Sequence, residues 1–313
     1  MLNIYKTVDE QCGFEEVSEF SKGCWISLVN PTEEELSFVG KGLNVNLDYL
    51  KHPLDEEERP RIDMEENQTL IILDIPVVED DEGLTNHITI PLGMVVIGDD
   101  YFVTICLKEN PIIDLFRDKK IRSFFTFKKT RFILQILQKT AEFYLKYLGA
   151  INRETDNVED ELQVSMKNKE VIRLLGLEKS LVYFTTSLKA NEIVMEKLLK
   201  GKYIKMYEED EDILEDAIVE NKQAIEMART YSDILSGMMD AFASLISNNL
   251  NIVMKFLTSV TIVVALPTMV ASFYGMNVAL PFQGTWFAFS YVLGISLLIS
   301  IIAVIMLRKR NMF

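Results

Sequence analysis

Residues 256–277 read FLTSVTIVVALPTMVASFYGMN, and this stretch decides how the whole chain is interpreted. No charged residue and no histidine occurs between Phe256 and Leu307. A helix needs about 20 consecutive apolar residues to cross the hydrocarbon core of a bilayer. The segment therefore predicts two membrane crossings, over residues 252–274 and 286–307, with a short loop between them.

Basic residues flank these crossings and predict their orientation. Lys255 stands at the start of the first crossing, and Arg308, Lys309 and Arg310 follow the second. Lys and Arg are enriched on the cytoplasmic side of membrane proteins. We therefore expect both chain ends in the cytoplasm and the loop outside, in an inner or plasma membrane with lipid around the crossings.

The rest of the composition bounds the partners and the compartment. The net charge of −15 argues against nucleic acid, whose phosphates would repel the chain, and favours cations. The alternative is that acidity only keeps the protein soluble. Cys12, Cys24 and Cys106 are an odd set without paired spacing, which predicts neither disulfides nor a zinc site and fits a reducing cytosol.

Before the membrane segment the pattern predicts an α+β cytoplasmic domain. Over 1–125 we expect a mixed sheet with helices: strands near 24–29, 69–78, 88–97 and 101–107, with acidic turns over 79–83 and 98–100. Thr32 and Glu35 have the spacing of a capping box that opens a helix, and a second short helix is expected near 46–50. Residues 126–206 predict long antiparallel helices, with breaks near Gly176 and Gly201.

A single long helix is expected from about residue 208 to residue 274, because only Pro267 is a strong breaker there. Its part over 207–250 would be a stalk, and residues 251–313 would form the two-helix membrane domain. Nine of twelve heptad positions in the stalk are apolar, which favours packing against partner helices and an oligomer. The positions are Leu214, Ile218, Asn221, Ile225, Ala228, Ser232, Leu235, Met239, Phe242, Ile246, Asn249 and Val253.

One face of the first crossing carries small or weakly polar side chains. Thr258, Thr261, Ala265, Thr268 and Ser272 lie within about 40° of the direction of Met254 on a helical wheel, and Asn251 and Leu257 lie about 60° away. Such a face suits close helix packing. It equally suits a water-filled pore lined by identical faces, and the face alone leaves both interpretations open.

The turn Tyr274-Gly275-Met276-Asn277 resembles the Gly-Met-Asn signature of the CorA family of divalent-cation channels. The resemblance extends back through Thr268, Leu257, Met254, Asn251 and Asp216 to Arg59-Pro60 and Cys24-Trp25-Ile26, so it covers nearly the whole chain. It implies a homopentameric funnel in which five first crossings line one pore and the second crossings surround them.

The resemblance also implies roles for single residues. Asn277 would offer a ring of carbonyls to hydrated Mg²⁺, an ion that loses its water reluctantly. Gly275 would permit the turn, and Met276 and Tyr274 would pack the mouth. The alternative for Asn277 is an ordinary helix C-cap. Met254 and Leu257 would form a hydrophobic constriction, with Asn251, Thr261 and Thr268 as further lining residues; alternatively they only pack helices.

Regulation would come from acidic residues. Asp212, Glu215 and Asp216 belong to an acidic cluster where the stalk begins, which is either a solvated helix N-terminus or, as the family implies, a site where cytosolic Mg²⁺ bridges subunits and closes the pore. The partner carboxylate of the family falls on His52 here, with Asp55 and Glu56 nearby. Histidine suits softer divalent ions than Mg²⁺, but it is also common as a plain surface residue.

These features together predict a passive Mg²⁺ influx channel that needs no organic cofactor and is not an enzyme. A transporter of Co²⁺, Ni²⁺ or Zn²⁺, either an importer or an exporter, is the nearest alternative; a membrane-anchored sensor or scaffold without a pore is another. Three departures from the family pattern bear on pore width and sensing: His52, an outer loop without an acid, and Pro267 shifted by one position with Ala265 in place of a bulky residue.

Overall fold

The computed structural model describes residues 1–9, 13–81, 84–164, 168–201, 203–278, 280–281 and 284–310. The chain divides into two compact units, Met1–Gly237 and Met238–Phe313. Cys12, Glu82 and Gly83, and part of the expected outer loop, lie outside the described residues.

The first unit is built on a seven-stranded mixed sheet with the strand order β2-β1-β3-β7-β6-β5-β4. Only β3 and β7 pair in parallel, and every other neighbouring pair is antiparallel. The strands are β1 (Leu2–Asp9), β2 (Gly13–Glu16), β3 (Trp25–Val29), β4 (Arg61–Glu65), β5 (Gln68–Asp81), β6 (Leu84–Ile97) and β7 (Tyr101–Cys106).

Short helices follow the strands and long helices complete the chain. The helices are α1 (Glu33–Leu43), α2 (Leu47–Lys51), the 3₁₀ turn η1 (His52–Leu54), α3 (Pro111–Arg117), α4 (Lys129–Val164), α5 (Asn168–Lys200), α6 (Glu208–Tyr274) and α7 (Ala288–Lys309). The capping box at α1 is confirmed, since Thr32 Oγ1 accepts from Glu35 N and Glu35 Oε2 accepts from Thr32 N.

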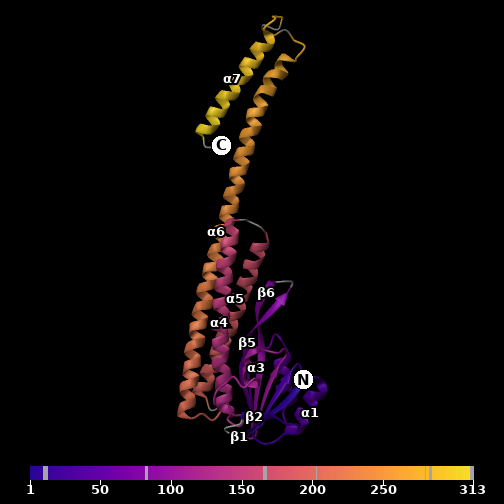
Figure 1. Cartoon of the computed structure of the whole chain (residues 1–313), viewed down its shortest axis with the longest axis vertical. Coiled ribbons are helices and arrows are strands. Elements are labelled where there is room, and N and C mark those ends of the chain that lie inside the picture. Colours follow the sequence, from indigo (N-terminus) through magenta and orange to yellow (C-terminus); the bar gives the residue numbers. More distant parts are fainter. Residues whose placement is uncertain are drawn as a thin grey trace. The chain divides into compact units, whose positions relative to one another are not determined.

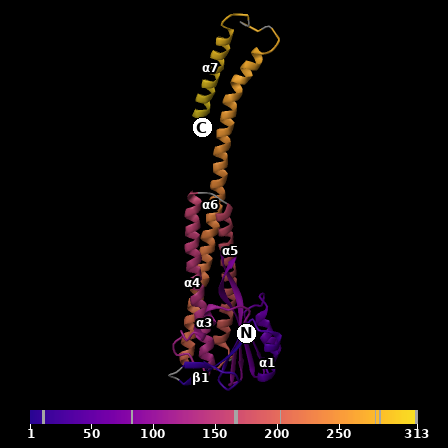
Figure 2. The same ribbon diagram turned by 45° about the vertical axis from the view of Figure 1, so that its right-hand side comes forward.

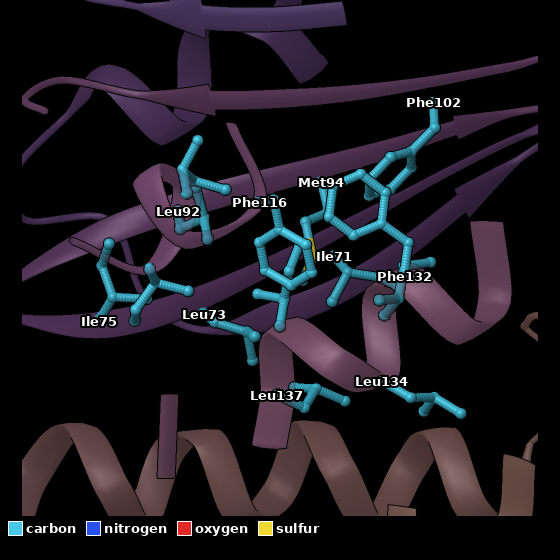
Figure 3. Packing of buried hydrophobic residues seen from close by; sticks show 14 of the residues in the cluster. Ile71, Leu73, Ile75, Leu92, Met94, Phe102, Phe116, Phe132, Leu134 and Leu137 are labelled. Carbon is cyan, nitrogen blue, oxygen red and sulfur yellow. The ribbon is translucent and has the colours of Figure 1, made fainter. Parts of the chain in front are cut away.

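The sheet separates two hydrophobic cores, because successive side chains of a strand point to opposite faces. In β5, Leu70 and Ile72 pack with α1 and α2, whereas Ile71 and Leu73 pack with α3, α4, α5 and α6. Figures 1 and 2 show α1 on the side of the sheet away from α4 and α5. Figure 3 shows the second core, where the rings of Phe116 and Phe132 lie 4.7 Å apart over the sheet residues.

Helix α5 is attached to the sheet at Asp74, just past the last residue of β5 that pairs with β4. Asn191 Oδ1 accepts from Asp74 N (2.9 Å), and Asn191 Nδ2 donates to Asp74 O (2.7 Å). Ser187 Oγ donates to the Asp74 carboxylate (2.6 Å). The amide of Asn191 thus satisfies backbone groups that an additional strand would otherwise pair.

Several expectations need correction. Strands β1, β2 and β4 were not predicted. Residues Glu79 to Asp81 belong to β5 rather than to a turn, so the β5–β6 hairpin is longer than expected. Gly176 lies inside α5 and does not end it, because an isolated glycine costs a helix only about 1 kcal/mol and the packing of α5 outweighs that. Gly201 does mark a helix end.

The first half of α6 confirms the heptad pattern within the first unit. Leu214, Asn221, Ala228 and Leu235 are fully buried, and Asn221 Nδ2 donates to Leu188 O of α5 (3.0 Å). One seam of α6 therefore packs against helices of its own chain and does not require a helix from another subunit.

In the second unit, α7 lies beside the last part of α6 (Figures 1 and 2). Both helices are long and apolar enough to cross a membrane, with mean hydropathies of 1.9 and 2.5 in their most apolar windows, of which 6% is buried. Pro267 lies inside α6 without ending it. The two predicted crossings are thus both helical.

Candidate functional site

The last part of α6 has two opposite faces. Ser259 is fully buried, and Val263, Leu266, Val270 and Tyr274 are partly buried, so this stripe packs toward α7. We call the exposed face, with Asn251, Met254, Leu257, Thr258, Thr261, Ala265, Thr268 and Ser272, the candidate pore face. At about 100° per residue, its centre lies roughly 160° from the centre of the stripe that packs toward α7.

Two of the four hydroxyl groups of the candidate pore face, those of Thr261 and Thr268, are oriented by the helix itself. Thr261 Oγ1 donates to Leu257 O (2.8 Å) and Thr268 Oγ1 donates to Val264 O (3.0 Å). A hydroxyl has one hydrogen to donate and two lone pairs that accept. Because the hydrogen is used within the helix, each oxygen presents lone pairs, which can accept from the water molecules around a cation.

The hydrophobic pair of the candidate pore face is half-exposed and can contact neighbours outside the chain. Met254 is 51% exposed and Leu257 is 56% exposed. Neither side chain packs into the core of its own subunit. Their alternative role, packing helices, would thus also require helices from other copies.

Helix α6 ends at the Gly-Met-Asn turn without help from the Asn277 side chain. Gly275 N donates to Ala271 O (2.9 Å) and Met276 N donates to Phe273 O (3.2 Å). Asn277 is exposed, and its side chain makes no hydrogen bond with any residue that the structure describes. The geometry therefore gives no support to the C-cap alternative for Asn277.

The other residues of the turn have simpler environments. Tyr274 OH donates to Pro281 O (3.4 Å), which joins the helix end to the loop. Gly275 does not adopt a left-handed conformation, and a Cβ there would lie 3.4 Å from Ala271 O and 3.6 Å from Ser272 O. The local backbone thus does not by itself require glycine. Met276 is 47% exposed.

The three candidate sensing acids at the start of α6 point outward. Leu214, Ala217 and Ile218 fill the core, which leaves Asp212, Glu215 and Asp216 on the exposed side of the helix. Asp210 differs from them, because it is buried and accepts from Tyr207 N (3.2 Å) as a capping group.

The sequence-based interpretation missed two carboxylates near these acids. Burial and the charge of Glu142 on α4 raise the pKa of Glu220, and Asp216 acts in the same direction while Lys139 opposes it. The spacing of Asp216 and Glu220 by one helical turn was visible in the sequence. The approach of Glu142 was not, because it depends on how α4 packs against α6.

His52 is already held by a cation. Arg61 Nη2 lies 2.9 Å from His52 Nδ1, and the same guanidinium bonds Asp63 (2.6 Å) and Glu58. A guanidinium only donates hydrogen bonds, so Nδ1 accepts and carries no proton. Glu56 pairs with Lys108 (3.4 Å), and Asp55 accepts from Glu57 N (3.0 Å).

One chain does not bring the two sets of candidate metal ligands together. Asp212, Glu215 and Asp216 belong to the sheet face covered by α6, whereas η1, which starts at His52, packs with the core on the other face. Among the described residues, no three His, Cys, Asp or Glu side chains are close enough to hold a metal ion. A shared site would need two subunits.

Comparison with known proteins places the chain in a family. Residues 20–309 match the family described as CorA-like Mg²⁺ transporter protein. This chain belongs to the CorA-like Mg²⁺ transporter family. Members of this family are membrane transporters of divalent cations, which agrees with the two membrane-spanning candidates.

A curated relative is the cobalt/magnesium transport protein CorA of Methanocaldococcus jannaschii, 31% identical over 301 residues, or 91% of this chain and 90% of the relative. The complete structure of the CorA magnesium transporter from that organism matches with a TM-score of 0.84 and 28% identity, covering 100% of this chain and 99% of that one. The structure of its soluble domain covers 78% of this chain and 97% of that domain, with a TM-score of 0.68 and 29% identity.

Proposed function

We propose that this chain forms a homopentameric channel that admits Mg²⁺ to the cytoplasm. The observation that carries the proposal is the opposition of the two faces of α6. Because α7 occupies one side, a ring of α6 helices with α7 outside would turn every candidate pore face toward a common axis. A non-conducting scaffold gives no reason for neutral oxygens along that side.

The chemistry of the candidate pore face suits a hydrated divalent ion. Mg²⁺ loses its water reluctantly, so acceptors that bind its waters are more useful than direct ligands. Asn277 would provide such acceptors at the outer mouth, and the oriented oxygens of Thr268 and Thr261 would follow. Conduction requires binding that is weak enough for the ion to leave, and neutral groups provide this.

The gate would lie at Met254 and Leu257, and Asn251 would line the pore on the cytoplasmic side of the gate. A closed ring of apolar side chains expels water and so blocks a hydrated ion. Cytosolic Mg²⁺ between Asp212, Glu215 or Asp216 of one subunit and acids of the next, including Asp55 and Glu56, would hold the ring closed. When this Mg²⁺ dissociates, the acidic side chains of neighbouring subunits would repel one another, and the ring would open. Binding at the sensing site and closure of the gate would thus be reciprocally linked.

The proposed orientation places both chain ends and the first unit in the cytoplasm, in an inner or plasma membrane. Lys255 and the basic residues Arg308, Lys309 and Arg310 carry this part of the proposal. The membrane potential would then drive influx, at about 2.3 kcal/mol per elementary charge per 100 mV. The function is transport rather than catalysis.

Ion uptake into proteoliposomes tests the proposal directly. Wild-type protein should admit Mg²⁺, and Asn277→Ala should lower the flux by about 100-fold or more, since it removes one acceptor from each of five subunits. Asn248→Ala is a matched control, because Asn248 is exposed on the same helix but lies about 120° from the centre of the candidate pore face. Its flux should stay at the wild-type level.

Competing ions and subunit mass complete the test. Co²⁺ should compete with Mg²⁺, because the Methanocaldococcus jannaschii relative is a cobalt/magnesium transport protein. Uptake of Zn²⁺ without Mg²⁺ would overturn the choice of ion, and no flux at all would favour a scaffold. The mass in detergent should correspond to five chains both for wild type and for Asn277→Ala; a dimer would exclude the proposed pore.

A further inference from the structure

The first unit contains a cavity of about 590 Å³ between β6 and the helices α4 and α5. Four of its lining residues are cations, namely Lys146 and Arg153 of α4 and Lys169 and Arg173 of α5. Glu154 is the one acidic residue among the described lining residues, and it pairs with Arg173. The cavity is therefore strongly basic in a chain whose net charge is −15.

Two of these cations form no ion pair with the described residues of the chain. Arg153 and Lys169 make no ion pair with any residue that the structure describes, whereas Arg173 bridges Glu154 and Glu161. The ammonium of Lys146 lies over the rings of Phe143 and Tyr147, 5.2 Å and 6.0 Å from their centroids. Like charges that gather without partners repel one another, and a bound anion would remove that cost.

A buried polar atom at the same place points independently to a ligand. His87 lines the cavity and is only 6% exposed, yet its Nδ1 has no hydrogen-bond partner. Its ring packs against Tyr147 and Phe184, with centroids 5.5 Å and 6.1 Å away. Buried polar groups are nearly always hydrogen-bonded, so an orphaned ring nitrogen beside a cavity suggests a missing partner.

We propose that this cavity binds a small molecule that carries phosphate groups. Its volume is in the range of small-ligand pockets, which are about 300–1,000 Å³. Arg presents a fork of donors that matches phosphate oxygens, and Lys supplies a point charge. Tyr147, Ile172 and Leu177 add an apolar wall against which a ring of the ligand can lie. A second cavity of about 550 Å³ shares Asn86, His87 and Gly176 and adds Lys179 together with Glu79, which pairs with Lys108.

This site is separate from the proposed pore. None of its described lining residues belongs to α6 or α7, and the proposal does not depend on which ion the protein transports. The charge and the size of the cavity define the class of ligand. A ring in the ligand, which would lie against the apolar wall, distinguishes a nucleotide from an inorganic polyphosphate.

Calorimetric titration of the full-length protein in detergent tests the site. The protein is first freed of divalent ions with EDTA, so that chelation by the ligand cannot imitate binding. Pyrophosphate and ADP are the two probes. Equal binding of both would show that phosphate alone carries recognition, and tighter binding of ADP would show that the apolar wall contributes; either result supports the site.

The decisive variant is Arg153→Gln with Lys169→Gln, which removes two exposed, unpaired charges without touching the core. We expect binding to weaken by about tenfold or more, as loss of charge-assisted hydrogen bonds predicts. The matched control is Lys189→Gln with Lys197→Gln, two exposed lysines of α5 outside the cavity. Its affinity should equal that of the wild type.

A second variant separates binding from folding. His87→Phe keeps the ring packing but removes the orphaned nitrogen, so binding should weaken while the melting temperature stays the same or rises. The proposal is overturned if neither probe gives saturable binding below about 10 mM. It is also overturned if the cavity pair binds like the wild type, or if the control pair weakens binding as much as the cavity pair.

Discussion

The two units of this chain differ in how much of their apolar side-chain surface is buried within the chain. Residues 1–237 bury two hydrophobic cores and close the backbone edge at Asp74 with an amide from α5. In the second unit the most apolar windows of the membrane helices are only 6% buried. The first unit therefore buries its cores within one chain, whereas the second exposes apolar side chains that lipid and other copies would cover in the proposed pentamer.

Among changes to the proposed gate and to the sensing acids, the largest effect is expected at the apolar ring, which would form only between copies. Leu257→Ser should raise Mg²⁺ flux under closing conditions by about tenfold or more, because five hydroxyls would let water into the constriction. Flux into proteoliposomes at high Mg²⁺ on the cytoplasmic side measures this. Val260→Ser makes a similar chemical change about 120° from the centre of the candidate pore face and should leave the channel closed. Equal leakage in both variants would mean that the ring is not the gate.

The next effect concerns the acids that would bridge copies. Neutralising Asp212, Glu215 and Asp216 as Asn, Gln and Asn should raise the Mg²⁺ concentration that half-closes the channel by about tenfold, because the bridging charge is lost. Flux measured against cytoplasmic-side Mg²⁺ gives this value. A control variant neutralises three exposed acids elsewhere, Glu15, Glu34 and Glu109. If the control shifts the curve equally, net charge rather than bridging controls closure.

The same contrast explains what the sequence could predict. The α1 capping box and the charge-free crossings are local signals, and both were predicted. Strands β1 and β2 pair near a sheet edge, and β4 is a five-residue edge strand, so their patterns were too short or too polar to recognise. The pairing of His52 with Arg61 and the approach of Glu142 to Glu220 depend on tertiary packing, which periodicity does not encode.

The candidate site was predictable for a different reason. Asn251, Met254, Leu257, Thr261 and Thr268 follow one helical face, and a face can be drawn from spacing alone. Whether that face points away from α7 depends on which side of α6 is buried. Ser259 is fully buried in the structure, and it lies on the side opposite the candidate pore face. The roles of these residues in a pore depend on contacts between subunits, so these roles remain predictions.

A third prediction tests the claim that the first unit is complete in itself. Burial raises the pKa of Asp74 to about 6, and the Ser187 hydroxyl only partly offsets this. Because the folded-state pKa is above the unfolded value, the folded chain binds more protons between about pH 4 and pH 6, and stability falls as pH rises through that window. At neutral pH the buried charge is a cost.

Asp74→Asn removes that charge and keeps an acceptor for Ser187. We expect it to raise the unfolding free energy at pH 8 by about 1–3 kcal/mol and to have little effect near pH 4. Thermal melting of residues 1–237 and of the full chain, each from pH 4 to pH 8, measures this. The gain should be the same in both proteins; a gain that appears only in the full chain would show that the first unit depends on its assembly.

The smallest effect is expected at His52, where the family pattern would place a metal-binding acid. The Arg61 guanidinium donates to Nδ1, so that nitrogen has no lone pair left for a metal ion, and the cation beside it repels divalent ions. His52→Gln retains an acceptor for Arg61 and should change the half-closing concentrations of Mg²⁺ and Zn²⁺ by less than about twofold. Asp55→Asn is the comparison, because its exposed carboxylate accepts only a local backbone hydrogen bond and stays available to a neighbouring subunit. A large loss of Zn²⁺ sensitivity in His52→Gln alone would mean that Arg61 releases the imidazole in the assembly, and the first unit would then share the dependence on neighbouring copies that distinguishes the second.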